Sequence, residues 1–498
     1  MKVLLLQPPN SRSRKKDVAA KQLSPHIGLA YVTACLRNEG IDVAVIDAQA
    51  ERLELEDVGR KIASINPDII GISSMTHQII DAAAVAELTK SISPKTTTVV
   101  GGAHPSALPE ETLHEFPAFD IAVAGEGELT MVELAKAIES GGRPEDLAKV
   151  AGISFRDGDE IVLNPPRPLI SDLDSLPFPA FDLFPLDKYW PYYRKRWCME
   201  LPLSLSRGCP RKCTFCAKIM GDTIRQRKVE SIIEEIKLDI SKHGAEQILI
   251  ASEDIAHTNK LLERVCEAII SEGLNEKVNF VTMSMVSIGR ELLALMRKAN
   301  FTHISFGIEC GNQSILKATK KGTTLEQARR AVRWAKELGF FVDASFIIGL
   351  PYETEKTIKD TIRFACELPL DNVSFSLLVP FPNTEVRRMA ERGEGGLVLL
   401  DGDWTSYGKQ FGGALALENL SQSDLKRLQF LAYIKFYSKP KRFLKAIGRL
   451  SFRTIARYLA HQFRNLLFSA RIFRRTQPRT TKDDGQNGEN PIRDKHAG

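Results

Sequence analysis

The chain has 498 residues, a net charge of +6, and 43% hydrophobic and 26% charged residues. This length predicts two or three domains, and the composition excludes collagen-like, largely disordered and disulfide-rich classes of protein. The eight cysteines are too sparse for a secreted disulfide framework, and no apolar run approaches the ~18 residues of a membrane-spanning helix. Because residues 1–10 lack a cleavage site and have the pattern of an opening strand, we expect a cytoplasmic protein.

The positive charge is concentrated near the C-terminus. Residues 435–475 contain twelve Lys and Arg and no Asp or Glu, whereas residues 476–498 contain four charges of each sign. Residues 1–434 therefore carry a net charge of −6, because the whole chain carries +6. A mildly acidic body precedes a strongly basic segment, which needs its own explanation.

Residues 1–145 alternate short β-branched segments with amphipathic helical windows. The predicted strands are 3–6, 42–46, 69–73, 97–100 and 120–123. This alternation predicts an α/β domain with a doubly wound parallel sheet and helices on both faces. Ligands of such sheets bind beyond the carboxyl ends of the strands, so the loops there are the candidate site.

Six prolines between 165 and 185 interrupt this alternation and predict an irregular Pro-rich linker over residues 146–195. Strands and helices then alternate again. The predicted strands are 203–206, 247–251, 278–283, 303–308, 341–347 and 372–378. Six such units predict a partial (β/α)6 barrel over residues 196–400, with its chemistry at the carboxyl ends of the strands.

Cys209, Cys213 and Cys216 form a C-x3-C-x2-C run directly after the first predicted barrel strand. Three thiolates on one short loop cannot complete a tetrahedral zinc site, and no His lies beside them. They can hold three corners of a [4Fe-4S] cluster and leave one iron open to a ligand. The alternative is that Cys198 or Cys310 supplies a fourth thiolate and closes an ordinary cluster or zinc site.

With these cysteines the sequence resembles the radical SAM superfamily. Further matching motifs are G-I-E-C-G at 307–311, G-L-P-Y-E-T at 349–354 and P-F-P-N-T at 380–384. Cys310 and Asn383 depart from the family pattern, which has Ser and Gly at these places. The resemblance implies that the open iron binds S-adenosylmethionine. The residues that it implies for this cofactor are Phe215 beside the adenine, Ser252, Glu253 and Asp254 at the methionine ammonium, Glu309 at the ribose, and Gly349.

The predicted order of a doubly wound sheet followed by such a barrel resembles the domain order of the cobalamin-binding subclass of this superfamily. The implied cobalamin-binding residues are Ser73, Ser74, Thr76, Gly101, Gly102, His104, Gly125 and Glu126. Small residues at these strand ends let a nucleotide tail approach the backbone. Residues 47–52 lack the His of the D-x-H-x-x-G motif of cobalamin mutases, which leaves a plain nucleotide-binding or degenerate domain as the alternative. The missing G-x-G-x-x-G after the first strand counts against NAD.

The resemblance implies an enzyme with a [4Fe-4S] cluster, S-adenosylmethionine and cobalamin as cofactors. It would cleave S-adenosylmethionine to a 5′-deoxyadenosyl radical and methylate an unactivated carbon of a small molecule, with lipids and tetrapyrroles among the candidates. An electron donor such as flavodoxin or ferredoxin is implied as partner. Two alternatives stay open: a radical SAM oxidative cyclase or other ring-forming enzyme, and a non-catalytic iron–sulfur or cobalamin-binding protein.

A stripe of cations marks the predicted basic helical domain over residues 401–475. Its members are Arg442, Lys445, Arg449, Arg453, Arg457, His461 and Arg464, which recur every three or four residues beside apolar neighbours. This pattern is compatible with a solvated helix face or with peripheral contact to the anionic inner face of a membrane, and it favours a membrane over nucleic acid. The polar tail 476–498 is predicted to be disordered.

Overall fold

The computed structural model describes residues 1–10, 24–189, 198–252, 258–400, 402–408, 412–440 and 442. These residues belong to one compact unit, Met1–Arg449. Two large sheets organise this unit, and each gathers a set of loops at one edge.

The first sheet begins with five parallel strands, as the sequence predicts. They are β1 (Lys2–Gln7), β2 (Asp42–Asp47), β3 (Ile69–Ser73), β4 (Thr97–Gly101) and β5 (Ile121–Val123). Their order in the sheet is β2-β1-β3-β4-β5. In β1, Leu4 pairs with Ala44 on one side and Ile70 on the other.

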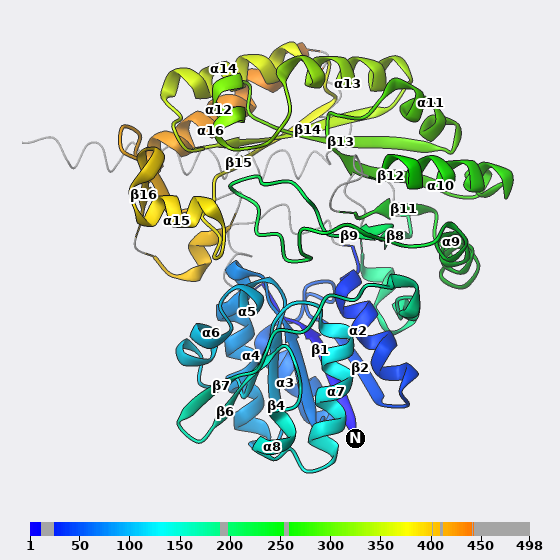
Figure 1. Ribbon diagram of the computed structural model, residues 1–498, viewed down its shortest axis with the longest axis vertical. Coiled ribbons are helices and arrows are strands. Elements are labelled where there is room, and N and C mark those ends of the chain that lie inside the picture. Colours follow the sequence, from blue (N-terminus) through cyan, green and yellow to red (C-terminus); the bar gives the residue numbers. More distant parts are fainter. Residues whose placement is uncertain are drawn as a thin grey trace, which may run out of the picture. The chain divides into compact units, whose positions relative to one another are not determined.

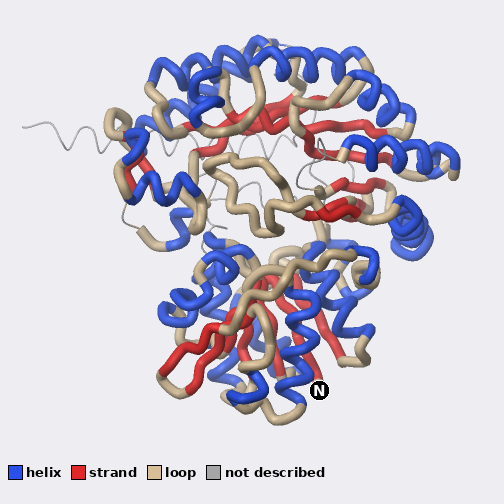
Figure 2. The backbone as a smooth tube through the Cα atoms, in the orientation of Figure 1, coloured by secondary structure: helices blue, strands red, loops and turns tan. Residues whose placement is uncertain are grey.

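Helices cover both faces of this sheet (Figures 1 and 2). They are α2 (Ile27–Asn38) and α7 (Gly127–Glu139) on one face, and α3 (Leu55–Ile65) and α4 (Ile79–Ile92) on the other. Successive side chains of a strand point to opposite faces. Val3 and Leu5 therefore belong to the core beneath α2 and α7, whereas Leu4 and Leu6 pack with α3 and α4. Shorter helices are α5 (Ala103–Ala107), α6 (Pro109–Glu115) and α8 (Pro144–Leu147).

Two strands that the sequence did not predict extend this sheet. β6 (Ile153–Asp157) and β7 (Glu160–Leu163) form an antiparallel hairpin that joins β5 through β6. They lie within the segment 146–195 that was predicted as linker. The proline-rich part begins only after β7 and holds three short 3-10 turns, η2 (Leu173–Ser175), η3 (Phe181–Leu183) and η4 (Leu186–Lys188).

The second sheet contains six parallel strands in the order β15-β14-β13-β12-β11-β8. They are β8 (Glu200–Leu203), β11 (Gln247–Ile250), β12 (Asn279–Ser284), β13 (Phe301–Glu309), β14 (Phe341–Ile348) and β15 (Asn372–Leu377). The helices between them lie along one face (Figure 2). They are α9 (Val229–His243), α10 (Asn259–Ser271), α11 (Arg290–Lys298), α12 (Gln313–Ala318), α13 (Leu325–Glu337) and α14 (Glu355–Glu367). Because β8 and β15 do not pair, the barrel is partial, as predicted.

The first barrel strand lies three residues earlier than predicted. The apolar and polar residues of 203–206 alternate as in a strand, but β8 already ends at Leu203. Ser206–Arg207 forms a separate strand, β9, which pairs antiparallel with β10 (Arg225–Gln226). This short ladder closes the base of the loop that carries the three cysteines.

After β15 the chain forms α15 (Glu385–Glu391), an antiparallel pair β16 (Leu397–Leu399) and β17 (Leu415–Leu417), and α16 (Gln422–Tyr437), which packs on β15 and α14. Short 3-10 turns are η1 (Thr76–Gln78), η6 (Leu274–Glu276), η7 (Glu394–Gly396) and η8 (Trp404–Tyr407). The predicted basic stripe beyond Arg442 and the tail 476–498 lie outside the described residues. Among the described helices, none combines the length and the apolar character needed to cross a bilayer.

Replacing a core side chain of β1 tests this packing. Leu4 is fully buried, so Leu4→Ala should lower the free energy of unfolding by about 2–5 kcal/mol through lost burial and the cavity left behind. Leu163, which is 49% exposed in β7, is the control, and Leu163→Ala should change it by less than about 0.5 kcal/mol. Urea denaturation measures both. Equal effects of the two substitutions would contradict the assigned core.

Candidate functional site

The loops after β3, β4 and β5 meet at one edge of the first sheet, because these strands are parallel neighbours. The Ser74 amide donates to the Gly101 carbonyl at 2.7 Å, and the Gly125 amide donates to Ser106 Oγ at 2.9 Å. Ser73 ends β3 and Thr76 begins η1, and both are buried. The structure thus brings the predicted cobalamin residues together.

Two glycines shape this edge. Gly102 has a φ of +104°, and a Cβ there would lie 2.7 Å from the Ser74 carbonyl oxygen, so no larger residue fits without a backbone shift. Gly125 has a φ of +81°, and a Cβ there would have no atom within 4 Å. One glycine permits close backbone packing and the other leaves open space, which suits a nucleotide tail that must approach the backbone.

His104 is a buried polar group at the same edge. Its side chain is 1% exposed, and Nδ1 has no hydrogen-bond partner among the described residues. Its ring meets the Trp404 ring edge-on at 4.8 Å. Burial lowers the pKa of His104 to about 4, so the imidazole is neutral at physiological pH. A buried nitrogen without a partner fits a polar group of a bound ligand.

Asp47 occupies the start of the stretch that lacks the mutase His. Its Oδ1 accepts from the amides of Gln49 and Ala50, and its Oδ2 accepts from the Tyr189 hydroxyl at 2.8 Å. The Asp47 carboxylate thus stabilises the turn that follows β2 and binds Tyr189 of the predicted linker.

We call residues 208–224 the cluster loop, because they contain the three cysteines. Gly208 opens it with a φ of +92°, and a Cβ there would clash with the Thr223 carbonyl oxygen. Hydrogen bonds hold the loop from both sides: the Cys209 amide donates to Gly221 at 3.1 Å, and the Thr214 amide donates to Thr319 at 3.1 Å. The loop is therefore held by its own ends and by the residue that follows α12.

The three thiols differ in exposure. Cys209 and Cys213 are partly buried, and Cys216 is exposed. Burial raises the pKa of Cys213, and the Lys321 ammonium opposes this most strongly. Within the described ranges, no three His, Cys, Asp or Glu side chains are drawn together as metal ligands in this structure. The fit to iron therefore depends on the donor set, since three soft thiolates on one loop are the ligands that iron–sulfur clusters use.

Glu309 faces the cluster loop from the end of β13. Its Oε1 accepts from Lys321 Nζ at 3.0 Å, and Glu309 is one of the charges that raise the pKa of Cys213. Lys321 Nζ in turn lies 5.9 Å from the centre of the Phe215 ring. A Cβ at Gly307 would lie 2.7 Å from Glu309 Oε1, so the glycine leaves room for this carboxylate. Sequence analysis missed Lys321, because no motif includes it and only the fold brings it to Glu309.

Of the other residues predicted to bind S-adenosylmethionine, two are described. Ser252, just after β11, is buried, and its Oγ accepts from the Leu205 amide at 3.0 Å. Gly349, just after β14, has a φ of +92°. Glu253 and Asp254 lie outside the described residues.

Cys310 is fully buried behind Glu309. Its Sγ lies 3.3 Å from Thr361 Oγ1, 3.8 Å from Glu353 Oε1, and accepts from the Asn312 amide at 3.4 Å. A serine hydroxyl could make the same contacts, which explains why either residue suits this place. These contacts occupy the sulfur and disfavour Cys310 as a fourth metal ligand.

Asn383 stands where the family turn has Gly. Its φ of +61° is in the left-handed region that Gly and Asn adopt most readily. Its Nδ2 also donates to the Ala107 carbonyl oxygen, at the end of α5, at 2.8 Å. The substitution keeps the turn and adds a contact to the first sheet's loops.

Most of the partly exposed residues of β13, β14 and β15 are small or polar, and the exceptions are Phe341 and Ile347 of β14. Ser305, Ser345, Ser374 and Ser376 alternate along these strands with buried residues. The buried set includes Phe306, Phe346 and Phe375, which belong to the core. Hydroxyl groups therefore line one part of the sheet face opposite the core.

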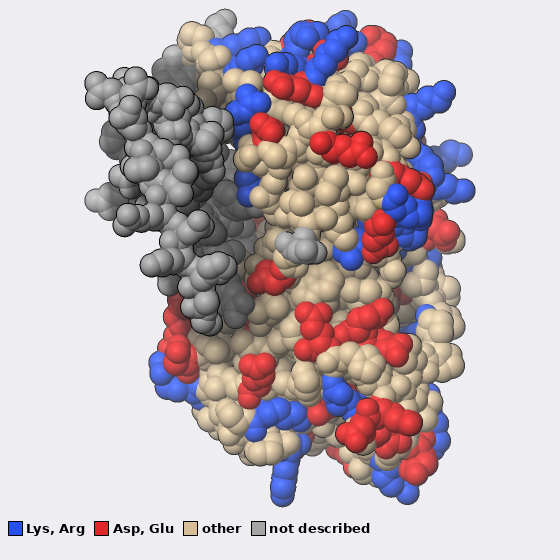
Figure 3. Space-filling view, turned by 90° about the vertical axis from the view of Figure 1, so that its left-hand side faces the viewer, with Lys and Arg blue, Asp and Glu red and all other residues tan. Residues whose placement is uncertain are grey.

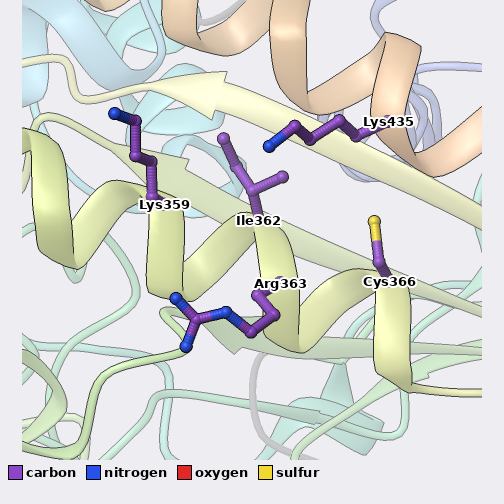
Figure 4. A pocket seen from close by; sticks show the side chains of 5 residues that line it. All are labelled: Lys359, Ile362, Arg363, Cys366 and Lys435. Atoms are coloured by element: carbon purple, nitrogen blue, oxygen red, sulfur yellow. The ribbon is translucent and has the colours of Figure 1, made fainter.

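A surface pocket of about 390 Å³ lies elsewhere, between α14 and α16. Lys359, Ile362, Arg363, Cys366 and Lys435 line it, and none is a predicted site residue (Figure 4). Lys359 pairs with Glu355 at 2.8 Å and Arg363 with Asp360 at 3.1 Å. These are ordinary surface ion pairs, and we assign no function to the pocket.

Comparisons with known proteins place this geometry in a family. Residues 18–135 match the B12 binding domain, and residues 203–365 match the Radical SAM superfamily. An uncharacterized methyltransferase of Pyrococcus horikoshii is 34% identical, and the match covers 90% of this chain and 95% of the relative. The chain belongs to the cobalamin-dependent radical SAM methyltransferase family.

Two further proteins are similar to this chain in sequence or in fold. The anaerobic magnesium-protoporphyrin IX monomethyl ester cyclase of Cereibacter sphaeroides is 31% identical over 76% of this chain and 61% of its own length. The solved structure of the cobalamin-dependent S-adenosylmethionine radical enzyme OxsB shares the fold, with a TM-score of 0.71 and 20% identity over 93% of this chain and 71% of that one. Family membership confirms the predicted fold class, the enzyme class and the three cofactors. Membership in this family also counts against the alternative of a non-catalytic iron–sulfur or cobalamin-binding protein.

Glu353 gives the site a pH-dependent stability that can be tested. Burial raises its pKa from 4.5 to about 7, although the amides of Gly349 and Leu350 donate to its Oε2. The folded protein therefore binds this proton more tightly than the unfolded chain, and stability falls as the pH rises from about 4.5 to 7. We expect Glu353→Gln to flatten this decline in denaturation curves taken between pH 5 and 8.

Glu355→Gln is the matched control for this measurement. Glu355 begins α14, two residues further along the chain, and is partly exposed. Its Lys359 partner lowers its pKa, so it stays ionised throughout the window. The control should keep the wild-type slope. A Glu353→Gln variant with an unchanged slope would show that Glu353 is ionised in the folded protein.

Proposed function

We propose that this chain methylates an unactivated carbon of a small molecule. Two observations together carry the proposal. The charged groups of Glu309 and Lys321 and the Phe215 ring lie beside the cysteines of the cluster loop. Gly102 and Gly125 shape the loop edge of the first sheet. When bound, the iron–sulfur cluster, S-adenosylmethionine and cobalamin would supply the radical and methyl-transfer chemistry. The chain's own residues bind and orient these groups.

Cys209, Cys213 and Cys216 are the proposed cluster ligands. The hydrogen bonds of Cys209 and Thr214 hold the loop before any metal binds. Because the loop is already held at these points, less of it has to order when a cluster binds. Cys198 and Cys310 are buried, and the contacts of Cys310 give it a structural role.

Phe215, Ser252, Glu253, Asp254, Glu309 and Gly349 are the proposed S-adenosylmethionine residues. To these we add Lys321, whose side chain is 6% exposed and whose ammonium pairs with Glu309. S-adenosylmethionine carries a carboxylate as well as an ammonium, so a site with both an acidic and a basic group matches its charges.

Ser73, Ser74, Thr76, Gly101, Gly102, His104 and Gly125 are the proposed cobalamin residues. Their support is the glycine geometry of Gly102 and Gly125 and the unpartnered Nδ1 of His104. A neutral imidazole can donate or accept one hydrogen bond at this edge.

The decisive variant is Cys213→Ala. In anaerobically reconstituted protein it should lose the open-iron cluster and all 5′-deoxyadenosine formation from S-adenosylmethionine, because two thiolates cannot hold three irons. Iron analysis and chromatography of the nucleoside products measure both. Cys366→Ser, which changes a partly buried thiol on α14, should keep both. Turnover by the Cys213→Ala protein would refute the assigned ligands.

Oxidative ring formation is the second candidate, because one relative is named a cyclase. The mass of the product distinguishes the two reactions when candidate substrates are incubated with the loaded enzyme. Methylation should add the mass of one CH2 unit, with the label of methyl-labelled S-adenosylmethionine. Loss of hydrogen or gain of oxygen without label would support the cyclase reaction instead.

We propose an electron donor such as flavodoxin or ferredoxin, and peripheral contact of the basic segment with an anionic membrane surface. Only the first cations of that segment are described, Lys435, Lys439 and Arg442, and the last two donate to the Cys366 carbonyl oxygen. On the face shown in Figure 3, acidic and basic side chains are interspersed.

A further inference from the structure

Glu126 lies in the turn between β5 and α7, within a buried group of four charges. The carboxylates of Glu126 and Glu128 and the guanidinium groups of Arg207 and Arg225 are each less than 10% exposed. Two negative and two positive charges balance, which makes the burial of this group possible.

Glu126 contacts both arginines. Its Oε1 accepts from Arg207 Nη1 at 2.9 Å and from Arg225 Nη1 at 2.8 Å, and its Oε2 accepts from the Ile170 amide at 2.7 Å. Burial alone would raise the pKa of Glu126, but these hydrogen bonds lower it, so the group is a carboxylate. Glu128 contacts Arg207 Nη2 at 2.7 Å.

The two arginines lie on either side of the cluster loop. Arg207 immediately precedes Gly208, and Arg225 immediately follows residue 224, where β9 and β10 pair. Arg225 Nη2 also donates to the Met220 carbonyl inside the loop at 2.9 Å. The Arg207 guanidinium lies 5.1 Å from the centre of the Tyr31 ring on α2. One carboxylate of the first sheet therefore joins both ends of the loop that carries the cysteines.

The residue before Glu126 belongs to the proposed cobalamin edge. Gly125 opens onto free space, whereas both oxygens of Glu126 are already engaged. We propose that Glu126 is a positioning residue that fixes the cluster loop against the cobalamin edge and so sets the separation of the two cofactors. The sequence had suggested direct cobalamin contact for Glu126. The inference rests on the proposed function, because it needs both cofactors to bind where assigned.

Glu126→Gln and Glu126→Asp test this in the full-length protein loaded anaerobically with cluster and cobalamin. The Gln side chain keeps the shape of Glu126 and removes its negative charge. The Asp side chain keeps the negative charge but is one methylene shorter. Glu133→Gln is the control, since Glu133 lies on α7, the helix that follows Glu126, and pairs with Arg167 near the surface. Pulsed EPR measures the coupling between the reduced cluster and cob(II)alamin, and iron and cobalt analyses give the occupancies.

We expect both Glu126 variants to bind the two cofactors at wild-type stoichiometry but to show a broadened or shifted distance distribution. The rate at which S-adenosylmethionine methylates reduced cobalamin should fall by about 10- to 100-fold, as a displacement of about 1 Å can cause. The control should match the wild type in every measurement.

Two results would overturn the inference. A wild-type distance distribution in both variants would show that Glu126 does not set the separation. Loss of cobalamin binding with an unchanged cluster would make Glu126 a direct cobalamin residue. If Glu126→Gln fails to fold, the Asp variant decides alone, because it retains the charge balance. A wild-type protein that binds no open-iron cluster would instead refute the proposed function.

Discussion

Parallel strand pairing is the constraint on which the whole site depends. When neighbouring strands run in the same direction, their carboxyl ends must meet at one edge, however far apart they are in sequence. In the first sheet this brings together the loops after β3, β4 and β5, and in the second it brings Glu309 and Gly349 to the ends of adjacent strands. The chemistry-bearing residues could therefore be scattered along the chain without losing their proximity.

Much of this arrangement could be predicted because it follows from local pattern. Buried parallel strands are short, β-branched and bounded by turn residues, and most predicted strands differ from the observed ones by one or two residues at an end. The first barrel strand was predicted three residues too late. The apolar–polar alternation at 203–206 continues past the end of β8 into β9, which pairs outside the large sheet. The hairpin of β6 and β7 was missed, because the prolines that follow it dominated the interpretation of the segment.

The side-chain partners could not be predicted in the same way. Lys321 follows Glu309 by twelve residues, and only the course of α12 brings its ammonium back to the carboxylate. Likewise, Arg207 and Arg225 are unremarkable in sequence, but β9 and β10 place them side by side opposite Glu126. Glu126 itself was singled out by the family resemblance, and the structure adds which residues it contacts. Long-range ion pairs of this kind leave no periodic signal along a chain.

Asn383 shows how a departure from a family pattern can add a contact without changing the turn. Its amide reaches a main-chain oxygen, which every amino acid presents, so mutations at position 107 need not disturb the bond. The contact therefore depends on the side chain at position 383, where glycine would preserve the turn and give up the link to α5.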